Sequence, residues 1–451
     1  MDIPPDLLRV KQAAEAELLS RPGVTGVDIG FKEVGGKPTG TLAIRVLVAE
    51  KKAVPKTQLI PSTIEGVPTD VIERKFELHP LKVAVTDITL EADTGTYDPL
   101  KGGISVGPCR SIGGFVYAGT LGCLVKDNAS GQFMLLSNFH VMCVDTGWSV
   151  GDTMTQPSLV DTGSCPGSVV GTLARASLGG SVDCAVAQQT QRGDACEIVD
   201  IGAVAGTSVA SLGLAVRKRG RTTGLTYGTV DAVALTVSLD YGDGLGVVTL
   251  TDQIGIAPTA ANPKFGDHGD SGSVVVNNAG EVVGLYFAGD TTGYGVANPI
   301  ADVAAALNVT VCTGTGTTSL YRYWNPGIGD HFYTTNWSEL GNGNYGWHFE
   351  EVQCQVQSQQ MAGTVPLYRY WNSGIGDHFY TTDWSELGNG NYGWHFEEVQ
   401  CYVLAQQASG SRPLYRYWNS GIGDHFYTTD WSELGNGNYG WHFEEVQCYV
   451  L

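Results

Sequence analysis

Three polar residues, far apart in the sequence, could together carry out nucleophilic catalysis. His140 follows the strand-like run 133–136, Asp183 lies inside the apolar run 181–186, and Ser271 lies in a Gly-Asp-Ser-Gly sequence. A serine hydroxyl is a weak nucleophile at neutral pH and needs a base to take its proton. A histidine can be that base, and an aspartate can fix its tautomer and stabilise the imidazolium. The three residue types therefore predict a catalytic triad.

The glycines around Ser271 fit the same chemistry. Glycine lets the backbone turn tightly, so the N–H groups of Gly269 and Ser271 can point at a developing oxyanion. Each such donor typically contributes about 3–4 kcal/mol to the transition state. We therefore predict an oxyanion hole at Gly269 and Ser271.

Each residue also has a structural interpretation. Gly-Asp-Ser-Gly is often a simple turn, a histidine after a strand is usually structural, and Asp183 beside Cys184 could be an ordinary strand residue. The combination, in order and with each residue beside a strand-like run, favours catalysis. His268, three residues before Ser271, is a second histidine, which we expect in a loop that lines the cleft.

The surrounding elements are expected to be mainly β. Between residues 100 and 312, short apolar runs alternate with Gly, Asp, Asn and Thr, which is typical of a barrel or sandwich. A helix over 299–307 is expected to close this domain. Residues 1–85 predict a small α+β domain, with a helix over 5–20 and strands over 24–34, 42–48 and 67–72.

The order His, Asp, Ser, with spacings of 43 and 88 residues, resembles the chymotrypsin-type serine proteases. The segments 118–122, 151–157 and 216–224, and N-terminal segments beginning at Pro22 and Leu42, resemble a trypsin-like subgroup that includes the plant Narrow-leaf proteins and bacterial relatives. This resemblance covers roughly residues 20–310. It implies a chymotrypsin-like double β-barrel, serine endopeptidase activity, and residues 1–85 retained in the mature enzyme. Phe139 stands where the subgroup usually has Asn, and His268 where it often has Pro.

The same resemblance places Phe265, six residues before Ser271, at the base of the primary specificity pocket. A phenyl ring there disfavours substrates with Lys or Arg and favours apolar or small side chains. The basic residues Arg217, Lys218, Arg219 and Arg221 could form a binding patch, but we interpret them as a solvated strand face.

Residues 319–451 contain three copies of one unit. Leu-Tyr-Arg-Tyr-Trp-Asn begins at Leu320, Leu367 and Leu414, with a period of 47 residues. Each copy has three to four β-like runs, and three copies predict a β-trefoil with pseudo-threefold symmetry. The repeats resemble short units of unassigned function in extracellular hydrolases of bacteria and fungi, and they lack the Gln-x-Trp signature of ricin-type lectins. Cys354, Cys401 and Cys448 are expected to be buried small apolar residues.

The repeats carry many aromatic residues beside recurring Asp-His pairs, a combination that suits carbohydrate binding. Aromatic faces stack on sugars, and polar side chains bind hydroxyls. The alternatives are that most of these residues pack the core, or that the Asp-His pairs bind metal. One His and one Asp per site are few ligands for a metal ion. The predicted carbohydrate-binding residues are Asp330, His331, Tyr333, Asp377, His378, Tyr380, Asp424, His425 and Tyr427.

Composition excludes several partners. The net charge of −20 disfavours nucleic acid and anionic membranes, and no run of about 18 apolar residues exists. No secretory h-region is visible near the start, so we expect a cytoplasmic or non-classically secreted protein. Ten cysteines without a CxxC pair predict no zinc site, and the sequence cannot pair them into disulfides. We expect no cofactor, and a homo-oligomer is left open.

Two classes of function remain. The first is an active endopeptidase with a protein substrate, targeted to a carbohydrate or glycoprotein by its repeats. The second is a lectin-like binding protein whose protease domain is latent or a scaffold. The intact triad favours the first.

Overall fold

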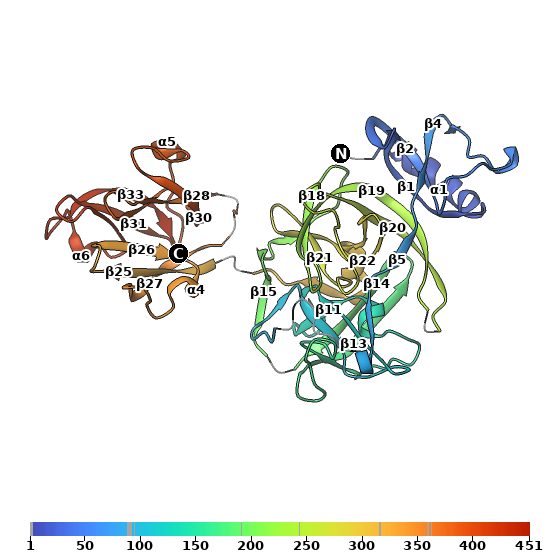
Figure 1. The fold of residues 1–451 in the computed structure, drawn as a ribbon, viewed down its shortest axis with the longest axis horizontal. Helices are drawn as coiled ribbons and strands as arrows, with labels where there is room; N and C mark the ends of the chain where they lie inside the picture. The colour runs from blue at the N-terminus through green and yellow to red at the C-terminus, as the bar shows by residue number, and fades with distance from the viewer. Residues whose placement is uncertain are drawn as a thin grey trace. The chain divides into compact units, whose positions relative to one another are not determined.

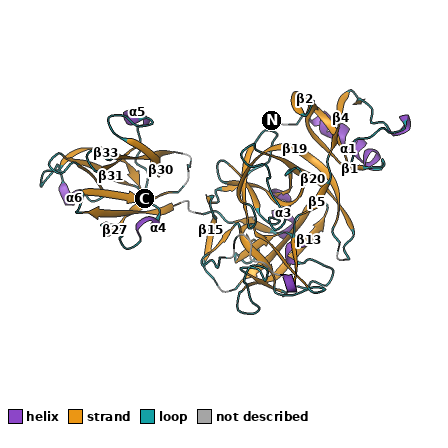
Figure 2. Ribbon diagram, in the orientation of Figure 1, coloured by secondary structure: helices purple, strands orange, loops and turns teal. Residues whose placement is uncertain are grey.

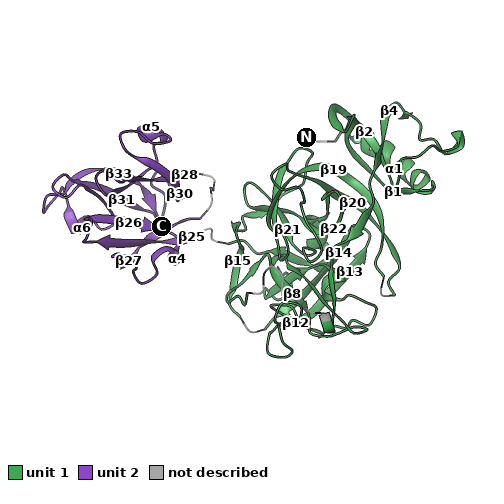
Figure 3. Ribbon diagram, viewed as in Figure 1, with its two compact units in different colours: residues 1–314 green, residues 315–451 purple. Residues whose placement is uncertain are grey.

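The chain divides into two compact units, residues 1–314 and 315–451 (Figure 3). The computed structural model describes residues 3–87, 93, 95–190, 192–242, 244–314, 317–358, 360–361 and 363–451, apart from the Ser338 side chain. Strands dominate both units (Figure 2), which confirms the prediction of a mainly β protein. Within the described ranges, no helix is long and apolar enough to span a membrane.

One barrel of the first unit is an antiparallel ring of six strands. Residues 115–127 form one strand that kinks at Gly122. The half before the kink, β9, pairs with β8, and the half after it, β10, pairs with β11. The ring therefore runs in the order β8–β9/β10–β11–β14–β13–β12, and β12 pairs back with β8. Side chains from all of these strands fill the core of this ring. The strands are β8 (Ile104–Pro108), β9 (Phe115–Leu121), β10 (Cys123–Asp127), β11 (Phe133–Ser137), β12 (Thr153–Thr155), β13 (Val169–Gly179) and β14 (Val182–Gln189).

The second barrel closes in the same way. Its strands pair in the order β18–β21–β22–β23–β20–β19, and β19 pairs back with β18. The strands are β18 (Ala215–Gly220), β19 (Gly224–Asp240), β20 (Val247–Pro258), β21 (Val274–Asn277), β22 (Glu281–Asp290) and β23 (Gly295–Pro299). The predicted double β-barrel is thus confirmed by its strand pairing (Figure 1).

The N-terminal part extends the second barrel's sheet, because β1 pairs with β19. The helix and strands expected within residues 1–85 are present, and the apolar face of α1 packs on β1 and β2. The bounds are α1 (Pro5–Leu19), β1 (Val24–Val34), β2 (Lys37–Val48), β3 (Thr63–Ile64), β4 (Val67–Glu73), β5 (Phe76–Leu78) and β6 (Leu81–Ala84), with short 3-10 turns at Lys56–Gln58 and Val85–Asp87. A separate domain ending at residue 85 stays a prediction.

Smaller elements complete this unit. The helix α2 (Phe139–Met142) follows β11, and α3 (Ile300–Leu307) matches the predicted closing helix. The remaining strands are β7 (Leu100–Gly102), β15 (Asp194–Ile198), β16 (Gly202–Ala203), β17 (Gly206–Thr207) and β24 (Val309–Val311). Disulfides join Cys109 to Cys165 and Cys196 to Cys312.

The second unit is threefold. Each repeat forms three antiparallel strands and a one-turn helix, and the three repeats share one core that contains Cys354, Cys401 and Cys448, unpaired and buried as predicted. The elements are β25 (Thr317–Asn325), β26 (Asp330–Thr334), α4 (Trp337–Leu340), β27 (His348–Gln357), β28 (Thr364–Asn372), β29 (Asp377–Thr381), α5 (Trp384–Leu387), β30 (His395–Leu404), β31 (Arg412–Asn419), β32 (Asp424–Thr428), α6 (Trp431–Leu434) and β33 (His442–Val450). The β-trefoil itself stays a prediction, since each repeat contributes three strands.

Candidate active site

The His140–Asp183 pair is built by the first barrel. His140 lies on α2, directly after β11, and Asp183 lies at the start of the adjacent strand β14. The Nδ1 atom of His140 lies 2.5 Å from Oδ2 of Asp183, and the backbone N–H of His140 donates to Oδ1 at 3.2 Å. Both side chains are buried. Two hydrogen bonds to one carboxylate fix both the tautomer and the orientation of the imidazole.

The second barrel holds the other side of Asp183. The hydroxyl of Tyr241, just beyond β19, donates to Oδ2 at 2.9 Å, and the backbone N–H of Asp183 donates to the Asn298 side chain at 3.2 Å. Burial and the Asp183 carboxylate raise the pKa of Tyr241 well above its ordinary value, so its hydroxyl stays a donor. The carboxylate is therefore locked from both barrels.

Ser271 lies at the seam between the barrels, just before β21. Its carbonyl oxygen accepts a hydrogen bond from the N–H of Thr120 on β9 at 2.7 Å. The turn requires glycine at Gly272, whose φ is +96° and where a Cβ would lie 2.2 Å from the carbonyl oxygen of Thr120. The Ser271 hydroxyl donates to the carbonyl of Phe287 at 3.1 Å.

Two of the three predicted catalytic residues are thus joined directly, and the third is not hydrogen-bonded to them. The Nε2 atom of His140 is buried and has no hydrogen-bond partner within the described part of the chain. A long or absent serine–histidine hydrogen bond is common before substrate binds. Phe139, next to His140, packs edge-on against Trp148 with ring centroids 5.8 Å apart.

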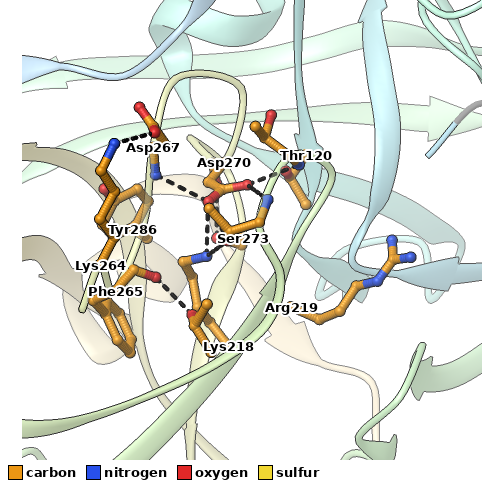
Figure 4. Close-up of polar contacts among 12 residues, drawn as sticks. Thr120, Lys218, Arg219, Lys264, Phe265, Asp267, Asp270, Ser273 and Tyr286 are labelled. Carbon is orange, nitrogen blue, oxygen red and sulfur yellow. Dashed lines mark hydrogen bonds and ion pairs between the residues drawn. The ribbon is translucent and has the colours of Figure 1, made fainter. Parts of the chain in front are cut away.

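A buried ion pair supports the turn that carries Ser271. The Lys218 ammonium lies 3.0 Å from Oδ2 of Asp270, and neither side chain is exposed to solvent (Figure 4). Thr222 and Thr223 donate backbone N–H groups to the other carboxylate oxygen. Burial alone would raise the pKa of Asp270, but the Lys218 ammonium and the hydrogen bonds hold it below its ordinary value. The turn is therefore pinned by an ionised carboxylate.

This ion pair corrects one prediction. The basic run was interpreted as a solvated strand face, but Lys218 and Arg221 are buried, and Arg221 pairs with Asp161. Alternation along β18 explains Lys218, since every second residue of the strand points into the barrel, whereas Arg221 lies just beyond the strand. Sequence reasoning missed Lys218, Asp270 and Tyr241 because their partners are distant in the sequence.

The predicted oxyanion donor Gly269 already has a partner. Its N–H donates to the carbonyl oxygen of His79 at 2.7 Å. The predicted pocket residue Phe265 is fully buried in the second barrel's core, edge-on to Tyr286 at 6.0 Å. His268 is half-exposed, as expected of a loop residue, and its ring lies 4.8 Å from that of His79.

In the second unit, the predicted carbohydrate-binding residues form the joints between repeats. The carboxylates of Asp330, Asp377 and Asp424 are buried, and each pairs at 2.5 Å with the histidine of the next repeat around the ring. Tyr333, Tyr380 and Tyr427 are buried around the threefold axis, where each hydroxyl donates to the carbonyl of the tyrosine in the preceding repeat around the ring. The aspartate and tyrosine side chains therefore do not face solvent.

Three aspartate carboxylates lie close together in the second unit. Their oxygen atoms lie within 4.8 Å of one another. Burial first, and neighbouring aspartates second, raise the pKa of Asp330 to about 8 and that of Asp424 to about 9. Burial lowers the pKa of His331 and His378 to about 4. At neutral pH, the carboxyl and the imidazole of Asp330–His378, and those of Asp424–His331, therefore share one proton in their hydrogen bond.

A pocket of about 270 Å³ lies between the second and third repeats. It is lined by Phe379, Glu386, Leu387, Trp394, Arg416, His425 and Glu444. Arg416 stacks over Phe379 at 4.9 Å, and the equivalent stacks recur at the other two joints. The joints thus offer aromatic, cationic and carboxylate groups together.

Comparison with known proteins gives two partial family matches. Residues 255–304 match the family Peptidase S7, Flavivirus NS3 serine protease, and residues 319–451 match a Domain of unknown function (DUF5648). No curated protein matches the chain.

Among solved structures, the chain is similar to Thermobifida fusca protease A, with 21% identity, 48% of this chain and 98% of that one covered, and a TM-score of 0.36. It is also similar to a glutamic acid-specific serine protease that utilises a novel histidine triad in substrate binding, at 22% identity, 47% and 100% coverage, and a TM-score of 0.36. Cellulomonas bogoriensis chymotrypsin matches at 23% identity, 47% and 98% coverage, and a TM-score of 0.34.

Proposed function

We propose that the protein is a chymotrypsin-like serine endopeptidase that uses Ser271 as nucleophile, His140 as general base and Asp183 to orient the imidazole. The observation that carries the proposal is the 2.5 Å pairing of His140 Nδ1 with Asp183, which leaves Nε2 unpartnered among the described residues. Ser271 stands on a glycine turn at the seam of two six-stranded barrels. The match to Peptidase S7 includes that turn.

The chemistry proceeds through an acyl-enzyme. Ser271 Oγ turns from the Phe287 carbonyl toward His140, attacks the substrate carbonyl carbon and passes its proton to Nε2. The N–H groups of Gly269 and Ser271 bind the resulting oxyanion. The imidazolium then protonates the leaving amine. Water hydrolyses the ester with His140 again as base, which returns the proton to Ser271.

The N-terminal part belongs to this enzyme. Arg45 is buried on β2, and its guanidinium binds Asp28 at 2.6 Å and Asp231 of the second barrel at 2.9 Å. Removing residues 1–85 would leave Asp231 without this cation and would expose the edge of β19. We therefore propose that the mature enzyme keeps these residues. Mass spectrometry of active enzyme that lacks them would contradict this.

A fluorophosphonate probe tests the activity. It should label Ser271, mapped by mass spectrometry of the tryptic peptide, because only an activated serine reacts. Ser271→Ala should remove the label and lower kcat on the order of 10⁶-fold while the fold is kept. A latent scaffold, which is the alternative, would not label in any variant. Near-wild-type turnover by Ser271→Ala would disprove the assignment.

We propose a second role for the repeats, as a trefoil-like module that binds a carbohydrate or glycoprotein. The joint pocket supports it, and so do Tyr345, Tyr392 and Tyr439, whose side chains are 89–90% exposed. Trp394, two residues after Tyr392, lines that pocket. Three equal sites could raise avidity on a multivalent surface by roughly 10²–10⁴.

A glycan array probed with the full Ser271→Ala chain tests this role. We expect binding that Trp394→Ala together with Trp347→Ala and Trp441→Ala abolishes, with circular dichroism unchanged. If the folded chain binds no glycan or glycoprotein on the array, the carbohydrate role should be dropped.

A further inference from the structure

A short segment of the N-terminal part crosses the active-site seam. Strand β5 pairs antiparallel with the end of β22, with Leu78 opposite Ala288 and Glu77 opposite Gly289. Three residues further on, β6 pairs antiparallel with β9 of the first barrel. Residues 76–84 therefore add one strand to each barrel and pass between them.

The crossing point lies at Ser271. The backbone N–H of His79 donates at 3.4 Å to the carbonyl of Phe287, the same oxygen that accepts the Ser271 hydroxyl. The carbonyl oxygen of His79 accepts from the N–H of Gly269 at 2.7 Å. A carbonyl held by the predicted oxyanion donor stands where the carbonyl of a cleavable bond would stand.

We propose that residues Phe76–Ala84 occupy the substrate cleft as a tethered, substrate-like inhibitor, with the His79 side chain in the primary specificity pocket. This inference rests on the proposed peptidase function. The antiparallel pairing on β22 is the way in which an extended peptide adds to a sheet edge, with main-chain bonds for affinity and a pocket for selectivity.

The pocket is defined by what surrounds His79. The imidazole is 3% exposed, and its Nδ1 lies 2.6 Å from the hydroxyl of Tyr286. The ring packs on His268, and a Cβ at Gly289 would lie 2.6 Å from its Cε1 atom. The polar end of the pocket is thus the Tyr286 hydroxyl, whereas Phe265 lies behind it, edge-on to the tyrosine ring.

This lining selects a class of substrate. Burial, and then the nearby His268, lower the pKa of His79 to about 4, so the imidazole is neutral at pH 7. A neutral side chain that reaches a hydroxyl with a hydrogen-bonding atom fits the pocket. Asp267 and Asp270 act on this end of the pocket, but they already bind Lys264 and Lys218. Lysine and arginine would therefore bury a second cation there without a carboxylate of its own.

The aligned peptide bond is poorly suited to cleavage, which makes the segment an inhibitor. The bond after His79 leads to Pro80, so the leaving nitrogen would carry a ring carbon in place of a hydrogen. Just before β5, Arg74 binds Asp290 at 2.8 Å and lies 3.6 Å from the centre of the Tyr294 ring. The segment is therefore tethered beside the cleft, and opening the site requires its displacement.

Fluorophosphonate labelling rates of the full-length chain test the inference. His79→Ala removes the pocket side chain, so Ser271 should label at least tenfold faster than in the wild type. Val85→Ala is the matched control, since Val85 follows the segment and is 50% exposed; it should label at the wild-type rate. Rapid and equal labelling of all three proteins would overturn the inhibitor and leave the peptidase standing. Absence of labelling in all three would overturn the peptidase and the inhibitory role together.

A second measurement locates the segment without catalysis. In the Ser271→Ala background, His79→Cys and Val85→Cys are compared for reaction with a water-soluble maleimide. The six unpaired cysteines of the chain are buried, so background reaction is low. The thiol at position 79 should react at least tenfold more slowly than that at position 85. Equal rates would show that the cleft is not occupied and would overturn the proposal.

Discussion

The same Asp–His geometry occurs once in the barrels and three times in the repeats. In all four pairs Nδ1 lies 2.5 Å from Oδ2 of the aspartate, and the histidine N–H donates to Oδ1 at 3.0–3.2 Å. The difference lies at the opposite nitrogen. Nε2 of His140 has no partner among the described residues, whereas Nε2 of each repeat histidine lies 3.9–4.0 Å from a glutamate.

An Asp–His pair of this geometry therefore serves, by itself, to hold a buried imidazole in one tautomer. In the repeats, each aspartate pairs with the histidine of the next repeat, so the three pairs close a ring that joins the module. In the barrels, the pair joins α2 to β14 and leaves Nε2 of His140 without a hydrogen-bond partner among the described residues. Catalysis, as proposed, depends on what faces Nε2.

The strongest test of this contrast is the same substitution at two pairs. Asp183→Asn should lower kcat about 10⁴-fold, because the amide favours the wrong imidazole tautomer. Asp424→Asn, at the same geometry, should leave kcat within twofold. Both are measured by peptide hydrolysis in the His79→Ala background, where the proposed inhibitor is loosened. Similar losses at both positions would refute the contrast.

The free energy of unfolding of the second unit should, in contrast to kcat, depend on the aspartates of the repeats. Asp377→Ala leaves the partly buried His425 without its partner and should lower the free energy of unfolding of the second unit by about 3 kcal/mol. Urea titration followed by tryptophan fluorescence reports this unit, since only Trp148 of the ten tryptophans lies outside it. Asp383→Ala, an exposed helix cap in the same repeat, is the control and should cost less. Equal losses would argue against the ring of pairs.

The sequence predicted the barrels and the residues of the proposed triad because their signals are local. Short strands, the Gly-Asp-Ser-Gly turn and a histidine after a strand are each visible within a few residues. It could not reveal that Lys218 meets Asp270, or that β5 pairs with β22 about 210 residues later, because such partners are chosen by packing.

The repeats show why recurrence of polar residues was ambiguous. Asp330, Asp377 and Asp424 recur with their histidines, which suggested three binding sites. A ring of equal units needs equal joints, so the same recurrence follows from assembly alone. The pairing runs between neighbouring repeats, with Asp330 bound to His378, and no spacing within one repeat could indicate it.

Two of these pairs, Asp330 with His378 and Asp424 with His331, give a pH test. A carboxyl whose folded pKa is raised stabilises the fold at low pH and loses that effect as pH rises from about 4 to its folded value, about 8 for Asp330 and about 9 for Asp424. An imidazole whose folded pKa is lowered to about 4, as in His331 and His378, stabilises the fold above pH 6.5 and loses that effect as pH falls to about 4.

Between about pH 4 and 6.5, the loss of stability from the carboxyls and the gain from the imidazoles cancel as pH rises. Above that range only the carboxyls of these pairs titrate. The urea midpoint of the second unit should therefore be level from pH 4.5 to 6.5 and fall from pH 6.5 to 8. The double variant Asp330→Asn, Asp424→Asn should flatten the fall, because an amide resembles the protonated acid. A midpoint that rises from pH 6.5 to 8 would contradict the assignment.

The smallest expected effect concerns the exposed tyrosines. Tyr392 adopts φ +55°, a left-handed conformation that costs a tyrosine about 1 kcal/mol, and Tyr345 and Tyr439 do the same. An exposed aromatic side chain in a strained turn, present in all three repeats, contributes little packing, which favours a binding role. Tyr392→Asn should keep the free energy of unfolding or raise it by up to about 1 kcal/mol, since Asn tolerates this conformation.

The same variant should weaken binding to the glycan or glycoprotein found on the array, and the triple Asn variant should weaken it further through lost avidity. Tyr227→Asn is the control, because Tyr227 is an exposed tyrosine of the first unit; binding should be unchanged. A loss of stability in Tyr392→Asn with unaltered binding would mean that the turn tyrosine supports the fold.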